Sequence, residues 1–296
     1  MIDFSCKHDI WLEDEDGSLQ RMDQPYFRAW PIAPGTWQIL TDGDFSYLIE
    51  GEDEALLIDS GYGAGNIRDF ARSLTDKPLS RICNTHDHFD HTANNSYFDL
   101  AYMSRETQAL ATRPFPSFSG IDFPRDYPVQ LVTDGDIIPL RGRDLRVFFI
   151  PDHAVGSLAF LDEKARILFS GDEFMAHGKA LHGGVAHWAQ MLEKLMPYRD
   201  RFDHLCAGAW PMMDASIVDN QLACARHILA GNEGEPAKPG RFPGEERVDA
   251  EGRRIWKRRI PHPGDGPANI NRDIEYKRVM RYAGTSITYD VRHIED

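Results

Sequence analysis

The feature that most constrains this chain is a histidine-rich run, THDHFDH at 85–91, in which three imidazoles and two carboxylates lie within seven residues. If this segment is extended, His86 and His88 project to the same side and can hold one metal ion. Asp90 and His91 follow where the chain turns, so they can face a second ion nearby. Because a polar loop rarely collects ligand side chains at this spacing, the run predicts a metal site.

Length and charge indicate a globular protein and argue against several kinds of partner. A chain of 296 residues can bury a core without disulfides or structural metals. It carries 47 acidic and 33 basic side chains, a formal net charge of −14, which argues against partners such as nucleic acid or an anionic membrane surface. No apolar stretch is long enough to predict a membrane span, and the first residues lack the pattern of a signal peptide. The four cysteines lie far apart, so we expect a cytoplasmic protein.

The hydrophobic pattern predicts strands and helices in both halves of the chain. Alternating apolar segments begin near Trp37, and a turn at 51–54 joins two of them as a hairpin. The predicted helices cover 66–75, 105–113, 184–199 and 214–231. Strands are expected at 81–85 and 99–104, and several more between 129 and 171. Because helices do not follow every strand, this order favours two packed sheets with helices outside, an α+β architecture.

We expect three parts along the chain: an irregular N-terminal lead-in at 1–34, a main domain at 35–231 and a C-terminal extension at 232–296. The extension begins in a stretch rich in glycine and proline and includes a predicted hairpin that turns at 249–252. Its apolar residues, such as Trp256, predict that it is ordered and packs near the metal site.

Four segments, in this order, are similar to those of the metallo-β-lactamase superfamily. The run at 86–91 matches its HxHxDH motif, and LLIDSG at 56–61 resembles its strand that ends in Asp-Thr/Ser-Gly. PDHAVGS at 151–157 resembles the segment that supplies a third histidine, and FSGD at 169–172 the strand whose aspartate bridges two metals. The resemblance covers about 35–230 and implies an αββα four-layer sandwich with two mixed sheets.

The resemblance also implies the metal ligands. The implied first site is His86, His88 and His153; the second is Asp90 and His91, with Asp172 shared between the two; and Asp59 supports the ligands by hydrogen bonds. The implied cofactor is zinc, one or two ions, with iron or manganese as alternatives. From the residues alone, His153 could be a structural loop histidine, and Asp172 and Asp59 could be turn residues.

The chain departs from the family at one position. The family has a Gly-His pair after a late strand, and that histidine completes the second site, whereas this sequence reads Gly208-Ala209-Trp210. Alanine cannot bind a metal ion. The spare histidines His182 and His262 are candidates for a replacement ligand.

These ligands imply a metal-dependent hydrolase whose substrate is a small molecule. A metal-bound hydroxide would attack the carbonyl of an ester, thioester, lactone or amide, and Asp90 would carry a proton to the leaving group. One alternative is a mononuclear non-haem iron oxygenase resembling persulfide dioxygenases, with His86, His153 and Asp172 as ligands. Another is a member without catalysis that only binds a ligand. Whether the chain forms a homo-oligomer stays open. The basic run at 253–259 is either a solvated hairpin or a cap that attracts an anionic substrate.

Overall fold

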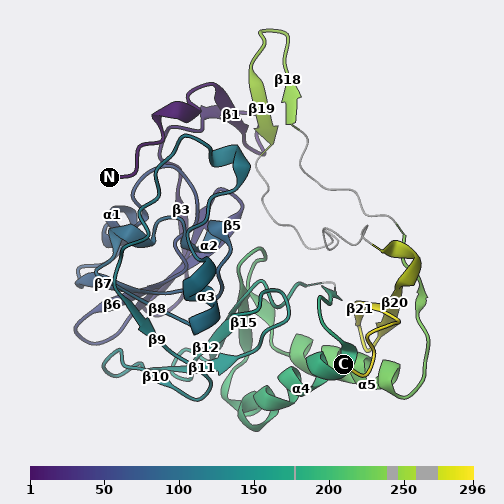
Figure 1. The fold of residues 1–296 in the computed structure, drawn as a ribbon. Helices are drawn as coiled ribbons and strands as arrows, with labels where there is room; N and C mark the ends of the chain where they lie inside the picture. The colour runs from purple at the N-terminus through teal and green to yellow at the C-terminus, as the bar shows by residue number, and fades with distance from the viewer. Residues whose placement is uncertain (177, 239–245, 258–272) are drawn as a thin grey trace.

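The computed structural model describes residues 1–176, 178–238, 246–257 and 273–296. Two large sheets form its centre (Figure 1). The seven-stranded sheet consists of β3 (Arg28–Ala33), β4 (Thr36–Thr41), β5 (Asp44–Glu50), β6 (Ala55–Ile58), β7 (Leu79–Cys83), β8 (Leu100–Met103) and β9 (Val129–Leu131), in that order. The six-stranded sheet consists of β10 (Ile137–Ile138), β11 (Leu145–Phe149), β12 (Leu158–Asp162), β13 (Ile167–Gly171), β15 (His204–Ala207) and β16 (Met213–Asp214).

Both sheets are mixed. In the first, β3 to β6 pair antiparallel and β6 to β9 pair parallel. In the second, β13 and β15 pair in parallel, and the other neighbours are antiparallel. The α-helices are α1 (Ile67–Arg72), α2 (Phe89–Thr92), α3 (Arg105–Leu110), α4 (Val185–Leu195) and α5 (Ser216–Leu229). Short 3-10 helices cover Ser5–Lys7, Asn95–Tyr97, Pro116–Phe118, Met196–Arg201 and Ile274–Tyr276.

The alternation of side chains along the central strands creates the layers. On β5, Tyr47 belongs to the core between the two sheets, whereas Leu48 packs on the other face, in the cluster that includes Ile67 of α1. On β12, Phe160 faces the same central core, and Leu161 faces the cluster formed with α4 and α5. The order helix, sheet, sheet, helix confirms the predicted four-layer α+β sandwich.

Helix α4 shows why the sequence forms the outer layer. Val185, Trp188, Leu192 and Leu195 recur at helical spacing, and all four are buried against the six-stranded sheet and α5. Burial of each such side chain contributes roughly 1.5–3 kcal/mol. The α-helix ends earlier than the predicted residue 199 and continues as a 3-10 helix, because Pro197 has no N–H to donate to the α-helical ladder.

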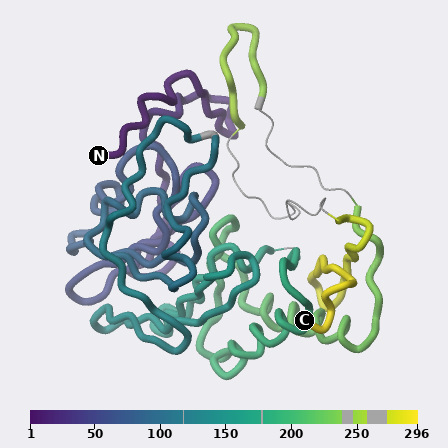
Figure 2. The backbone as a smooth tube through the Cα atoms, in the orientation of Figure 1, coloured from purple at the N-terminus to yellow at the C-terminus, as the bar shows by residue number. Residues whose placement is uncertain are grey.

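The prediction of an irregular lead-in over 1–34 was wrong. β1 (Ile10–Glu13) pairs antiparallel with β2 (Leu19–Arg21) and parallel with β19 (Arg254–Lys257), which forms a hairpin with β18 (Glu246–Val248). Figures 1 and 2 show this hairpin beside the N-terminal segment. β3 is an edge strand of the seven-stranded sheet. The lead-in is ordered because β1 and β3 pair with strands outside it, which local composition does not reveal.

The C-terminal strands form a fourth sheet beside α5. It consists of β14 (Lys179–Ala180), β21 (Thr285–Asp290), β20 (Lys277–Tyr282) and β17 (Glu235–Pro236), in that order. Met280, Ile287 and Tyr289 are buried in the same cluster as α4 and α5. Among the described residues, none of the helices is both long and apolar enough to cross a lipid bilayer.

Candidate metal centre

The ends of strands from both sheets meet at one edge of the sandwich, where the predicted ligands gather. Asp59 follows β6 directly, and His86 follows β7 after two residues. Asp172 directly follows β13, in the opposite sheet. The end of β13 approaches Thr85 so closely that a Cβ at Gly171 would lie 2.4 Å from the Thr85 hydroxyl, so a glycine is needed there. The fold therefore brings segments far apart in sequence to one point.

The first group of side chains consists of His86, His88 and His153, which offer ligand nitrogens within 4.8 Å of one another. His88 Nδ1 and His153 Nε2 lie 3.0 Å apart. Burial lowers the pKa of His86 well below its usual value and that of His153 to about 3. Both rings are therefore neutral at physiological pH and keep the lone pair that metal ligation requires.

A second group consists of His86, His91 and Asp172, and it places the Asp172 carboxylate between the two groups. Asp172 Oδ1 lies 3.7 Å from His91 Nε2, and Asp172 Oδ2 lies 3.6 Å from His153 Nε2. Two ligands at ~2.0–2.1 Å from one tetrahedral ion are about 3.4 Å apart. One carboxylate oxygen is thus within ligand distance of each group.

His91 is oriented by hydrogen bonds on its side away from Asp172. Its Nδ1 lies 2.9 Å from Asp59 Oδ2, and the two carboxylate oxygens of Asp59 also accept from the backbone N–H and the hydroxyl of Thr85. The carbonyl oxygen of His91 accepts from Asn84 and from both the backbone N–H and the hydroxyl of Ser60. These contacts leave Nε2 of His91 as the nitrogen that faces Asp172.

The polar atoms left over at this point fit a cation. His86 Nε2, His91 Nε2 and Asp172 Oδ1 are buried and have no hydrogen-bond partner in the described part of the chain. Although burial opposes a charge on His91, the carboxylates of Asp59 and Asp172 raise its pKa well above the usual value. The electrostatic field here thus favours positive charge, which a divalent ion supplies in place of the proton.

A third group, which the sequence did not predict, consists of Asp44, Asp90 and His91, with ligand atoms within 4.8 Å of one another. Asp44 is the first residue of β5, and the antiparallel pairing of β5 with β6 brings it to the edge where Asp59 lies. Burial raises the pKa of Asp90, and the charge of Asp172 adds to the rise. The sequence offered one signal for Asp44: it places a carboxylate at the start of a strand, and this strand begins at the edge where the metal groups lie.

The segment after β15 approaches the same groups through its backbone. A Cβ at Gly208 would lie 2.3 Å from Asp172 Oδ1 and 2.5 Å from His91 Cε1, so only glycine fits there. Ala209 is buried in the apolar cluster with α4 and α5.

The spare histidines lie elsewhere or outside the described residues. The ring of His182 stacks on that of His153 at 5.6 Å, but His182 belongs to none of the three groups. His262 lies outside the described residues. In the basic run, the described Arg253 pairs with Asp249, and Arg254 lies 3.9 Å from Asp9.

A buried charged cluster supports the segment that carries His153. Glu173 Oε1 accepts the backbone N–H groups of Asp152 and His153, and its other oxygen accepts from Lys179 Nζ at 2.7 Å. Lys179 Nζ also lies 2.8 Å from Asp152, whose carboxylate accepts the backbone N–H of Gly183. All three charged side chains are almost fully buried. No sequence motif marks this cluster, although Asp152 directly precedes His153 and Glu173 directly follows Asp172.

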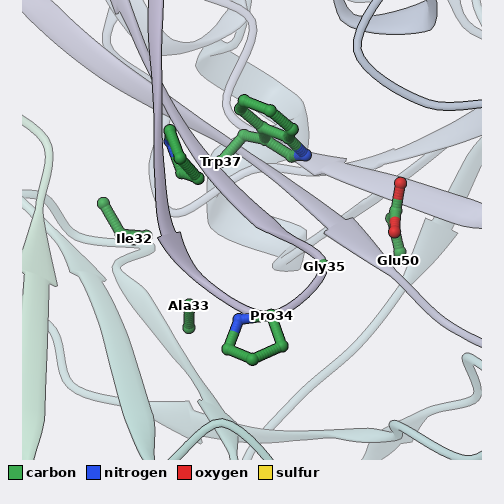
Figure 3. Close-up of a pocket in the computed structure, with 7 residues that line it drawn as sticks. Ile32, Ala33, Pro34, Gly35, Trp37 and Glu50 are labelled. Carbon is green, nitrogen blue, oxygen red and sulfur yellow. The ribbon is translucent and has the colours of Figure 1, made fainter.

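The cavity in Figure 3 is separate from the metal groups. It has a volume of about 460 Å³ and is lined by the turn between β3 and β4 together with Trp37 and Glu50. Glu50 ends β5, whereas Asp44 begins it. Six residue steps of about 3.3 Å place the cavity about 20 Å from Asp44.

Comparison with known proteins identifies the family. Residues 41–230 match the model of the metallo-beta-lactamase superfamily. The acyl-coenzyme A thioesterase MBLAC2 of Homo sapiens is 30% identical over 210 residues, which cover 60% of this chain and 70% of that protein. The atrochrysone carboxyl ACP thioesterase of Aspergillus fumigatus is 27% identical over 183 residues, 60% of this chain and 53% of its own length.

The fold is shared with solved structures of low sequence identity. The metallo-beta-lactamase from Hirschia baltica matches with a TM-score of 0.52 at 16% identity, over 68% of this chain and 98% of that one. Since the family model spans most of the two central sheets and the metal groups, the chain belongs to the metallo-beta-lactamase superfamily and is an enzyme of its hydrolase class.

Proposed function

We propose that this chain is a metal-dependent thioesterase that cleaves the acyl thioester of a small carrier molecule. The observation that carries the proposal is the position of Asp172, with one oxygen 3.7 Å from His91 and the other 3.6 Å from His153. Divalent ions held in these groups would activate water at neutral pH and polarise a carbonyl oxygen. Zinc suits the three-histidine group best, because imidazole is among its preferred ligands.

Asp90 is the residue that we assign to proton transfer. Its Oδ1 is buried without a hydrogen-bond partner among the described residues, and burial raises the pKa of its carboxyl group. A carboxyl group with a raised pKa holds a proton more readily than an ordinary carboxylate does. Asp90 is therefore suited to return a proton to the departing thiolate.

Two exposed apolar side chains support an acyl substrate. Val155 is 63% exposed and lies two residues after His153, while Phe115 is 42% exposed and its ring contacts Phe89, the neighbour of His88, at 5.4 Å. Apolar side chains beside a polar site can hold a hydrocarbon chain. The names of the two similar thioesterases point to the same bond, in an acyl-coenzyme A and in an acyl carrier protein.

The proposal is tested with purified protein that has been freed of metal and then reloaded with zinc or manganese. Acetyl- and palmitoyl-coenzyme A, a matched oxygen ester, a lactone and an amide serve as substrates. Cleavage is followed by loss of the thioester's ultraviolet absorbance, since the exposed Cys6 would react with a thiol reagent. We expect metal-dependent cleavage with a higher kcat/KM for thioesters than for the other substrates.

The substitution Phe115→Ala provides a control for the acyl site. It should raise KM for the palmitoyl substrate and leave acetyl-coenzyme A cleavage nearly unchanged. Thioester cleavage without metal, or a clear preference for the lactone or amide, would contradict the proposal.

The same preparation also tests the alternative that the chain is a one-iron oxygenase, by its iron content and oxygen uptake. The extra group of Asp44, Asp90 and His91 favours two ions over one. Oxygen uptake by protein that holds a single iron would support the oxygenase. The cytoplasmic location and a homo-oligomer stay predictions from the sequence.

A further inference from the structure

We propose that Asp44 is a metal ligand that takes the place of the family's missing histidine and makes the second metal position rich in oxygen. This inference rests on the proposed function, since it concerns the same two-ion site. It is carried by the group of Asp44, Asp90 and His91, whose ligand atoms lie within 4.8 Å of one another.

The backbone explains why Asp44 reaches the place that the segment after β15 vacates. The N–H of Phe45 donates to the carbonyl of Gly208 at 2.7 Å, so the start of β5 lies directly beside Gly208. The close approach of Gly208 to His91 and Asp172 leaves no room for a side chain at that position. Ala209 is buried among apolar residues and offers no donor atom. At the start of β5, beside Gly208, Asp44 therefore provides a carboxylate oxygen near His91.

The buried imidazole of His91 points independently to a ligand. The ring is fully buried, its Nδ1 contacts Asp59, and its Nε2 has no hydrogen-bond partner in the described part of the chain. Asp90 Oδ1 is in the same situation. Two ionised carboxylates at the separation of Asp44 and Asp90 repel each other, and a cation between them removes this repulsion, as protonation of one of them would.

The donor set indicates which ion this position prefers. Asp44 and Asp90 supply two carboxylates beside one imidazole, His91, and Asp172 Oδ1 lies 3.7 Å from the same imidazole, whereas the first group supplies three imidazoles. Carboxylate ligands suit manganese and other hard ions, and imidazole suits zinc. We therefore infer a mixed centre, with zinc in the histidine group and a harder divalent ion such as Mn²⁺ beside Asp44.

The experiment measures metal binding and not activity. Metal-free wild-type protein, Asp44→Asn and the control Glu50→Gln are dialysed against graded Mn²⁺ or Zn²⁺, and bound metal is counted by mass spectrometry, with Mn²⁺ also followed by electron paramagnetic resonance. Glu50 is a carboxylate at the opposite end of the same strand. The wild type and Glu50→Gln should bind two ions.

Asp44→Asn should keep the first ion, which also reports that it is folded, and bind the second at least about tenfold more weakly. A further variant, Asp44→His, should bind two ions and shift the preference of the second position from manganese towards zinc.

The outcomes separate this inference from the proposed function. If Asp44→Asn binds the second ion as tightly as the wild type, or if the wild type binds a single ion at every concentration, the inference is wrong while metal-dependent hydrolysis can still hold. If the wild type binds no metal ion, both are wrong.

Discussion

At the residue scale, two chemically identical side chains of the candidate centre, His86 and His91, differ in protonation because their surroundings shift their pKa values in opposite directions. His86 is made neutral by burial, because nothing nearby offsets the loss of water strongly enough. His91 is equally buried, but Asp59 and Asp172 lie on either side of it and raise its pKa. A cation that binds at this point replaces a proton on one ring and uses an existing lone pair on the other.

The variants His86→Ala and His153→Ala should each lose metal and activity. Each removes one nitrogen of the three-histidine group, and we expect the first ion to bind at least about 100-fold more weakly. The control is His293→Ala, because His293 is exposed and pairs with Asp296 near the C-terminus. Metal content after dialysis and thioester cleavage are measured; near-normal values for His153→Ala would remove it from the ligand set.

Asp59→Asn tests the support of His91. The amide cannot accept hydrogen bonds on both sides as the carboxylate does, so His91 loses orientation and the second ion should bind about 10–100-fold more weakly. Competition with a metal-binding dye measures the affinity. Asp203→Asn, an exposed carboxylate paired with Arg166, is the matched control; equal affinities in the two variants would exclude a role for Asp59.

At the element scale, one short strand outside the main sheets places a buried charge beside the candidate centre. β14 contributes Lys179, which pairs with Asp152 and Glu173, the sequence neighbours of the candidate ligands His153 and Asp172. Burial alone would lower the pKa of Lys179, but the two carboxylates raise it. β14 in turn pairs with β21, so the C-terminal sheet holds the lysine in place.

Lys179→Met should destabilise the protein strongly. It leaves two buried carboxylates without their counter-ion, which typically costs about 3–5 kcal/mol. Urea unfolding measures the change. Arg226→Met removes an exposed ion pair with Glu193 and should cost less than about 1 kcal/mol; a similar small effect for Lys179→Met would mean that the cluster contributes little.

An ion pair at the end of β21, in the hairpin of β20 and β21, makes the stability of the fold depend on pH. Hydrogen bonds from Arg292 lower the pKa of Asp290 to about 2, against about 3.9 in an unfolded chain. A lowered folded-state pKa stabilises the fold above pH ~4, and this contribution is lost as the pH falls from about 4 to about 2. Because Arg292 is partly exposed, we expect about 1 kcal/mol.

The measurement compares unfolding of metal-free wild type and Asp290→Asn across this range. Their difference should be constant well above pH ~4 and shrink as the pH falls through about 2. A difference that grows with acidity would contradict the assignment.

At the scale of the whole molecule, the two ends of the chain are built into the fold. The N-terminal β1 pairs with β19, more than two hundred positions later in the sequence (Figure 2). Near the other end, the carbonyls of His293, Ile294 and Asp296 accept the first backbone N–H groups of α4. That helix has no side-chain cap of its own, so the C-terminal residues satisfy its first donors.

Ile287→Ala tests whether the extension at 232–296 belongs to the core. Ile287 is fully buried with α4 and α5, so its truncation should cost about 2–5 kcal/mol. Val248→Ala, in the exposed hairpin, should change stability by less than about 0.5 kcal/mol. Limited proteolysis complements the unfolding measurement: rapid removal of residues 240–296 with full activity retained would mean that the extension is a dispensable tail.

The sequence by itself determined the two faces of the central strands and the outer helices, and it predicted a metal site at the histidine-rich run. These are local properties, because side-chain alternation and ligand spacing are set within a few residues. The grouping of that run with Asp59, His153 and Asp172 was implied by the resemblance to the family and not by any local pattern. The positions of strand ends then follow from the sandwich.

Only the tertiary structure decided the rest. The pairing of β1 with β19, the nearness of Asp44 to His91 and the burial of Lys179 between two carboxylates each join residues that are remote in sequence or unremarkable in their local pattern. Such contacts depend on how whole elements pack, and the free energy of that packing is shared over many residues, so no short segment carries the information.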